Sequence, residues 1–152
     1  MTYTTITPRH ISNEYTDIDE LLVHINFELL LKFLEENEQS DIVDWTESKI
    51  NDKSVIDIMC DLSDWYLTQY LPYFNGSTRE QFFNGLDEPE MNSEPLEIDS
   101  EFYRLVFKYN SPEHEIEYDK RIKEWIQFES DFHYETQQKL HLLIDCRPFM
   151  WI

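Results

Sequence analysis

The stretch SVIDIMCDLSDWYLTQY, residues 54–70, decides the fold. Its apolar residues return every three or four positions, a spacing that places side chains on one face of an α-helix. They are Val55, Ile58, Met59, Leu62, Trp65, Tyr66 and Tyr70. Ser54 and Asp57 have the spacing of a capping box at a helix start, and Pro72 marks the expected end. This pattern predicts an amphipathic helix.

A second helix is expected over residues 27–38, where FELLLKFLEENE carries its apolar residues on one helical face. Asn26 is placed to cap it. The preceding residues 21–27 alternate apolar and polar side chains, which fits either a short strand or the approach to that helix.

The longest predicted helix begins at Ser111-Pro112, because serine is a favoured cap, proline suits the first helical position and acids follow in the first turn. Its apolar rhythm continues to about Cys146, and Pro148 ends it. Such a helix is either the spine of the domain or is broken once near residues 128–131.

The segment before it is acidic. Asn75-Gly76 and Asn84-Gly85 are turn dipeptides, and no basic residue lies between Arg79 and Arg104. We therefore expect a long acidic loop over residues 87–101. The following run FYRLVFKY, residues 102–109, fits a strand or a short helix.

The composition predicts one folded domain over residues 1–152. Low hydropathy with high net charge is typical of disorder, but aromatic residues make up 15% of the chain and hydrophobic residues 41%. Such side chains bury large areas. The predicted fold is mainly α: a single compact helical domain with a terminal arm over residues 1–16, the acidic loop, and room for one short strand pair.

The net charge is the main pointer to function. The 152 residues include 32 acidic and 12 basic side chains, for a formal net charge of -20. Solubility needs only a magnitude of about 2 to 8 in a small domain, and excess charge destabilises the compact state. Either the charge is incidental, or the anionic surface meets a cationic partner. Clefts that receive nucleic acid are cationic, since phosphate contacts supply much of nucleic-acid affinity.

Three sets of acidic residues are candidates for binding such a partner. The first is a stripe on the polar face of the central helix, formed by Asp57, Asp61 and Asp64. The second follows the first helix and comprises Glu35, Glu36, Glu38 and Asp41. The third lies in the acidic loop and comprises Glu88, Glu90, Glu94 and Glu97. Each set also fits a simple solvated surface.

Motifs of catalysis and metal binding are missing from the sequence. There is no GxSxG, P-loop, GxGxxG, HExxH or EF-hand pattern. Glu129, His133, Gln137, His141 and Asp145 recur every four residues, but His133 and His141 are about 12 Å apart along a helix, too far to share one ion. We expect no metal, no cofactor and no enzyme activity. Cys60 and Cys146 are expected to be buried free thiols.

The two ends of the chain resemble a group of small proteins of tailed bacteriophages. In FHYETQQKLHLLIDCRPFMWI the resemblance rests on an acid-Thr pair, a Leu-rich helix, an Arg and a terminal aromatic, Met, Trp ending. VHINFELLLKFLEENE is similar to the group's Phe, Leu, Leu, Phe, Glu pattern. The resemblance covers about a third of the chain and implies a phage origin without implying an activity.

Two functions follow as expectations. The first is a phage-encoded acidic interaction protein that inhibits a host nucleic-acid-binding or defence enzyme by mimicking nucleic-acid charge. The alternative is a non-enzymatic module that sequesters a ligand in an aromatic pocket, as a homo-oligomer. Direct nucleic-acid binding is disfavoured by the charge. No apolar stretch suits a membrane span or a signal peptide, so a cytoplasmic protein is expected, in the host cytoplasm if phage-encoded.

Overall fold

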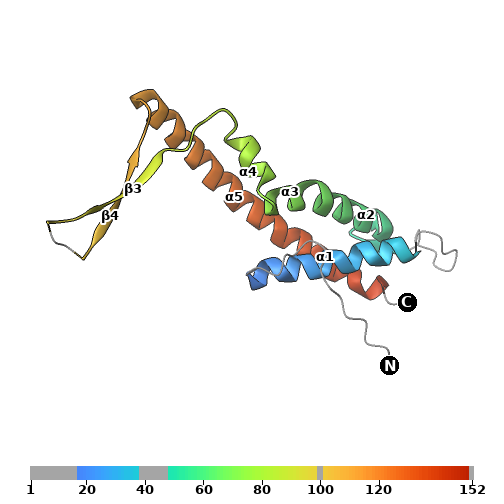
Figure 1. The fold of residues 1–152 in the computed structure, drawn as a ribbon. Coiled ribbons are helices and arrows are strands. Elements are labelled where there is room, and N and C mark those ends of the chain that lie inside the picture. The colour runs from blue at the N-terminus through green and yellow to red at the C-terminus, as the bar shows by residue number, and fades with distance from the viewer. Residues whose placement is uncertain (1–16, 38–47, 99–100, 151–152) are drawn as a thin grey trace. The chain divides into compact units, whose positions relative to one another are not determined.

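The computed structural model describes residues 17–37, 48–98 and 101–150, and it confirms a mainly helical fold (Figure 1). The elements in order are α1 (Ile18–Asn37), β1 (Lys49–Ile50), β2 (Lys53–Ser54), α2 (Val55–Trp65), a π-helix (Tyr66–Tyr70), α3 (Leu71–Phe74), α4 (Ser77–Phe82), β3 (Glu90–Pro95), β4 (Tyr103–Lys108), α5 (Pro112–Cys146) and a 3-10 helix (Arg147–Met150). The predicted arm over residues 1–16 lies outside the described residues.

The chain divides into two compact units. The first combines the chain up to Phe74 with the chain from His133 onward, and the second comprises Asn75–Phe132. A single-domain organisation therefore stays a prediction. Helix α5 is continuous through residues 128–131, so of the two alternatives for the longest helix, the unbroken one is correct.

The first unit has its core on the apolar face of α2, as the three- and four-residue spacing predicts. Val55, Met59 and Leu62 are buried there, together with side chains from α1 and from the end of α5. These are Val23, Phe27, Leu30, Leu143 and Cys146. Burial of these side chains is the main stabilising term for the unit, at roughly 1.5–3 kcal/mol for each large one.

The first helix begins earlier than predicted. Residues 18–26 belong to α1, so the alternation that fits a short strand is in fact the start of a helix. Asp17 accepts a hydrogen bond from the Asp19 N–H (3.0 Å) and so occupies the cap position predicted for Asn26. Asn26 lies inside the helix, where its amide donates to the Leu22 carbonyl (2.7 Å).

The central helix departs from prediction at both ends. Ser54 is the N-cap residue of α2, but it makes no side-chain cap hydrogen bond, so the capping box with Asp57 is wrong. Instead the Val55 N–H donates to the Ser48 carbonyl (2.9 Å). At the other end, helical structure continues past Pro72 to Phe74 through a five-residue π-helix. Such wide turns are rare and often occur at functional sites.

The β1–β2 pair is a tight hairpin directly before α2. Ile50 pairs with Lys53, which leaves Asn51 and Asp52 as a two-residue loop, and both have positive φ angles of 49° and 64°. A type I′ turn requires positive φ at both positions, and Asn and Asp tolerate it well. This turn directs the chain into α2.

The second unit packs α4 against the first part of α5. Phe82 of α4 contacts Trp125 (5.3 Å between ring centroids), and Trp125 stacks on Phe128 (5.2 Å). Arg121 donates a hydrogen bond to the Phe82 carbonyl (2.6 Å) and so satisfies an acceptor at the end of α4. The predicted turns at Gly76 and Gly85 are present with positive φ. Helix α4, between them, was not predicted.

The predicted start of α5 is confirmed. Ser111 Oγ accepts from the His114 N–H (3.1 Å), which is the cap expected of a serine before Pro112. His114 also holds the preceding chain, because its Nδ1 accepts from the Asn110 N–H (3.1 Å) and its Nε2 lies 2.7 Å from the Asp87 carbonyl oxygen. With Nδ1 as acceptor, the ring proton is on Nε2 and is donated to Asp87.

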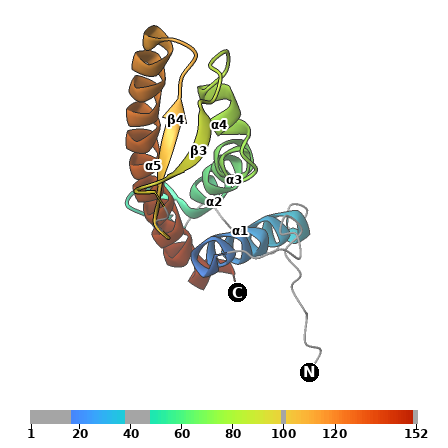
Figure 2. The same cartoon turned by 60° about the vertical axis from the view of Figure 1, so that its left-hand side comes forward.

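The predicted acidic loop is wrong over residues 90–95, whereas residues 87–89 and 96–98 on either side have no regular structure. Residues 90–95 form β3, which pairs antiparallel with β4, so Glu90 faces Lys108 and Glu94 faces Arg104 (Figure 2). Cross-strand pairs of opposite charge favour this register. The described residues therefore hold two short strand pairs rather than one.

Candidate functional site

The acidic stripe lies where the sequence predicts it. Asp57, Asp61 and Asp64 are all exposed on α2, opposite its buried face. The structure adds a cation to this surface: Lys53 of β2 forms an ion pair with Asp61. The Asp61 hydrogen bond and charge raise the Lys53 pKa above its ordinary value. The two side chains are 53% and 63% exposed, so the pair is solvated and contributes little to stability.

Cys60 shares the exposed side of α2, contrary to the prediction of a buried thiol. Partial burial raises the pKa of the Cys60 thiol, and the charges of Asp57 and Asp61 raise it further. Like charges nearby disfavour ionisation. The raised pKa of the Cys60 thiol therefore reflects in part the negative charge of the stripe.

The second acidic set is only partly described. Glu35 and Glu36 are exposed in the last turns of α1, and Glu36 pairs with Lys32 one turn earlier (3.7 Å). Glu38 and Asp41 lie outside the described residues. This set adds exposed carboxylates at one end of α1, where a negative charge is not favoured by the helix dipole.

The third acidic set differs most from its prediction, because basic residues compensate it. Glu88 pairs with Arg79 (3.1 Å), Glu94 with Arg104 (3.2 Å) and Glu90 with Lys108 (4.0 Å). Glu97 is exposed beyond the end of β3. Acidic residues from a segment that contains no basic side chain thus gain basic partners from α4 and, once β4 pairs with β3, from the opposite strand.

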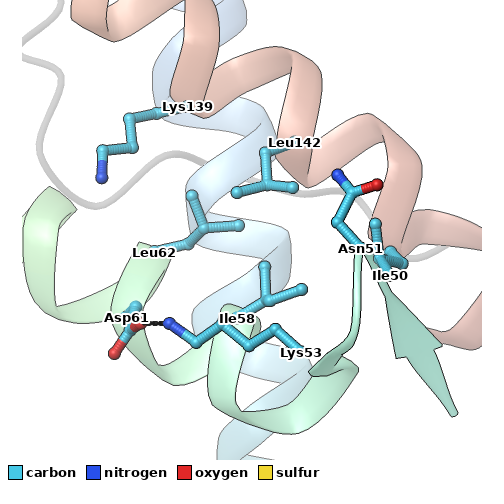
Figure 3. Close-up of a pocket in the computed structure, with 8 residues that line it drawn as sticks. All are labelled: Ile50, Asn51, Lys53, Ile58, Asp61, Leu62, Lys139 and Leu142. Carbon is cyan, nitrogen blue, oxygen red and sulfur yellow. Dashed lines mark hydrogen bonds and ion pairs between the residues drawn. The ribbon is translucent and has the colours of Figure 1, made fainter.

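A pocket of about 260 Å³ adjoins the stripe. Its lining residues are Ile50, Asn51, Lys53, Ile58, Asp61, Leu62, Lys139 and Leu142 (Figure 3). The two lysines have partners already: Lys53 pairs with Asp61, and the Lys139 ammonium lies 5.9 Å from the centre of the Trp65 ring. None of the eight residues is aromatic, so this is not the aromatic pocket of the alternative hypothesis. Its volume is below the roughly 300–1,000 Å³ typical of small-molecule sites.

Many of the aromatic residues form cores instead. Trp65, Tyr66 and Tyr70, which the sequence places on the apolar face of the central helix, are buried. In the second unit, Phe83, Trp125 and Phe132 are buried. Stacking and edge contacts between these rings add to the area they bury.

A buried polar cluster was missed by sequence reasoning. His24 is fully buried, and its Nδ1 lies 2.8 Å from the Tyr66 hydroxyl. The ring is met edge-on by Tyr70 and Phe74 (5.4 and 4.3 Å between centroids). Burial raises the pKa of both the Tyr66 and Tyr70 hydroxyls. The signal in the sequence is a histidine between Val23 and Phe27, on the apolar face of its helix.

Across residues 17–37, 48–98 and 101–150, no group of three His, Cys, Asp or Glu side chains could hold a metal ion. Within the same part of the chain, no helix combines the length and apolar character needed to cross a bilayer.

Comparison with known proteins gives no match: no protein-family model fits the chain, and no curated protein or solved structure is significantly similar to it.

Proposed function

We propose that this chain is an acidic interaction protein that occupies the cationic, nucleic-acid-binding cleft of another protein and blocks it by mimicking nucleic-acid charge. The observation that carries the proposal is the exposed stripe of Asp57, Asp61 and Asp64 on a chain with net charge -20. An inhibitor of this kind needs shape and charge at its surface and no catalytic residue.

The spacing of the stripe supports mimicry. Residues 57 to 64 span about 10.5 Å of helix axis, and one strand of a duplex advances one charge per roughly 3.4 Å. Three carboxylates over this length approach that density. Lys53 lowers the charge in the middle of the row, but its pair with Asp61 is more than half exposed. A cationic partner can therefore displace Lys53 with little loss of stability.

The resemblance at the two ends of the chain, rather than the charge, suggests the kind of partner. A host enzyme such as a defence nuclease, a restriction enzyme or a polymerase, met in the host cytoplasm, is proposed because the two ends of the chain resemble small phage proteins. Charge complementarity alone selects any protein with a basic cleft.

The test is capture of proteins from a bacterial lysate on the tagged chain, followed by purification of the captured protein. Binding of the purified pair should weaken as salt rises, because exposed charges are screened beyond about 8 Å at physiological ionic strength. A short duplex DNA should compete with the chain. The variant Asp57→Asn, Asp61→Asn, Asp64→Asn should weaken binding at least about tenfold, mainly by slowing association.

A matched control removes three exposed carboxylates elsewhere: Glu80→Gln, Glu135→Gln and Asp145→Asn. It carries the same net charge as the stripe variant and should bind more tightly than that variant. Equal binding by the stripe variant and wild type would show that the stripe is not the contact surface. If the variant with Glu88, Glu90, Glu94 and Glu97 changed to Gln also binds like wild type, mimicry is wrong and the ligand-binding module becomes the better hypothesis.

A further inference from the structure

The β3–β4 hairpin sorts its residues onto two chemically different faces. The register pairs Met91 with Phe107, Ser93 with Leu105 and Pro95 with Tyr103. Because side chains alternate along a strand, these three pairs share one side of the hairpin. We call this side the apolar hairpin face. The other side carries the pairs of Glu90 with Lys108, Asn92 with Val106 and Glu94 with Arg104.

The apolar hairpin face is open to solvent. Met91 is 61% exposed, Tyr103 64%, Leu105 63% and Phe107 50%. Contiguous apolar surface of this kind is uncommon on a soluble monomer and marks an interaction site.

The hairpin also needs a partner for its own stability. The strands form a two-stranded sheet within the described residues. An isolated two-stranded hairpin is at best marginally stable in water, and packing of its apolar face is what stabilises it. A partner that covers this face would therefore bury apolar surface and stabilise the pairing of the two strands.

The local charge argues against a cationic occupant. The strands Glu90–Pro95 and Tyr103–Lys108 contain two acidic and two basic residues, and these four form the two cross-strand ion pairs. Their net charge is zero on a chain of net charge -20. A basic partner finds no charge complementarity on these strands, whereas two copies of this chain can meet there with little local repulsion.

The area of the apolar hairpin face is compatible with a second copy. Four of its large side chains, Met91, Tyr103, Leu105 and Phe107, are at least half exposed, and two of them are aromatic. An aromatic side chain offers about 150–250 Å² when fully buried. The face therefore offers on the order of several hundred Å² per copy, a large part of the roughly 800 Å² that each partner contributes to a standard interface.

We propose that the apolar hairpin face is a self-association surface, which packs against the same face of a second copy to form a two-fold symmetric dimer. A two-fold interface uses one self-complementary patch on both copies. The two hairpins stack as sheets about 10 Å apart. Leu105 lies in the middle strand position of the face, so its counterpart in the second copy is its nearest neighbour across the axis. This proposal is independent of the charge-mimic function, since the stripe is on α2.

The first test is the molar mass of the full chain in solution, measured by light scattering after size exclusion over a range of concentrations. Wild type should form a dimer, and the dimer should tighten as salt screens the repulsion between two copies of charge -20. Binding through the acidic stripe has the opposite salt dependence. Leu105→Thr with Phe107→Thr should raise the dimer dissociation constant at least about tenfold. Val106→Thr, on the other face, should leave it unchanged.

A second test does not depend on destabilising the hairpin. In a Cys60→Ser background, Leu105→Cys should be cross-linked into a dimer by a short bismaleimide, because Cα atoms about 10 Å apart are too distant for a disulfide. Asn92→Cys, on the opposite face, should not be cross-linked. A wild-type chain that is monomeric at all concentrations would overturn the proposal. So would a dimer that survives the Leu105 and Phe107 changes, or equal cross-linking at positions 92 and 105.

Discussion

Helix α2 and the β3–β4 hairpin separate apolar from charged side chains equally well, but only α2 buries its apolar face. In α2 the separation follows the 3.6-residue helical period, and Leu62 is 1% exposed. In the hairpin it follows the two-residue strand period, and Leu105 is 63% exposed. The period of the sequence therefore identifies an apolar face, whereas burial of that face depends on whether another segment covers it.

The largest predicted effect compares these two leucines directly. Leu62→Ala should lower the free energy of unfolding by about 2–5 kcal/mol, because it removes buried methyl groups and leaves a cavity. Leu105→Ala should change it by only about 0.5 kcal/mol at a concentration where the chain is monomeric. Urea denaturation of both variants measures the difference. Similar losses would mean that the hairpin face is covered in the monomer.

A second effect belongs to the helical core and concerns alkaline pH. Burial raises the pKa of the Cys146 thiol from about 9 to about 11. Between these values the unfolded chain loses a proton that the folded chain keeps, so the free energy of unfolding should fall as pH rises. The loss is at most about 3 kcal/mol, since each pKa unit corresponds to about 1.4 kcal/mol.

Urea denaturation between pH 8 and pH 10, at one protein concentration, measures this decline. The variant Cys146→Ala is the control: it is less stable at pH 8, but its free energy of unfolding should depend less on pH. An unchanged slope in the variant would assign the decline to other groups. The buried Tyr66 and Tyr70 hydroxyls, whose pKa values are also raised, act in the same direction above about pH 10.

A third effect separates buried from exposed polar groups. Tyr66→Phe removes the hydroxyl that lies 2.8 Å from His24 Nδ1, and it should cost about 1–2 kcal/mol, since the buried ring nitrogen loses a partner. Tyr134 is 68% exposed on α5, so Tyr134→Phe should be nearly neutral. Thermal unfolding of the two variants makes the comparison. Equal melting temperatures would show that the His24 contact adds little to the core.

The smallest effect tests the electrostatics of the exposed face of α2. Asp57→Asn removes a charge that raises the pKa of Cys60, so alkylation of Cys60 at pH 8 should accelerate by up to a few-fold. The buried Cys146 should react slowly in both proteins. Glu135→Gln serves as a control remote in sequence and should leave the rate unchanged. An acceleration that persists undiminished at 1 M salt would contradict an electrostatic origin.

Much of the helical part of the fold could be predicted from local sequence. The spacing of Leu62 and its apolar neighbours identifies the buried face of α2, and Ser111-Pro112 identifies the start of α5. Both signals lie within a few residues of the structure they predict. The early start of α1 was missed because the sequence around Asn26 fits two periods equally well.

The hairpin could not be predicted from β3 alone. Glu90–Pro95 contains acids, Asn, Ser and Pro, which are rare in strands, and its conformation depends on pairing with β4. The same pairing places Lys108 and Arg104 beside Glu90 and Glu94. The third acidic set is therefore partly neutralised by residues that are distant from it in the sequence. The stripe on α2 was predicted correctly as an exposed set, but Lys53 reaches Asp61 only through the turn at Asn51-Asp52.

The discontinuous first unit has a consequence for how the protein is made. Its core requires residues up to Phe74 and also Leu143 and Cys146 near the other end of α5. A ribosome adds about 5–20 residues per second, so the synthesis of residues 75–146 delays closure of the first unit by several seconds. During this interval the apolar face of α2 lacks its last partners. We expect nascent chains to bind chaperones until α5 is complete.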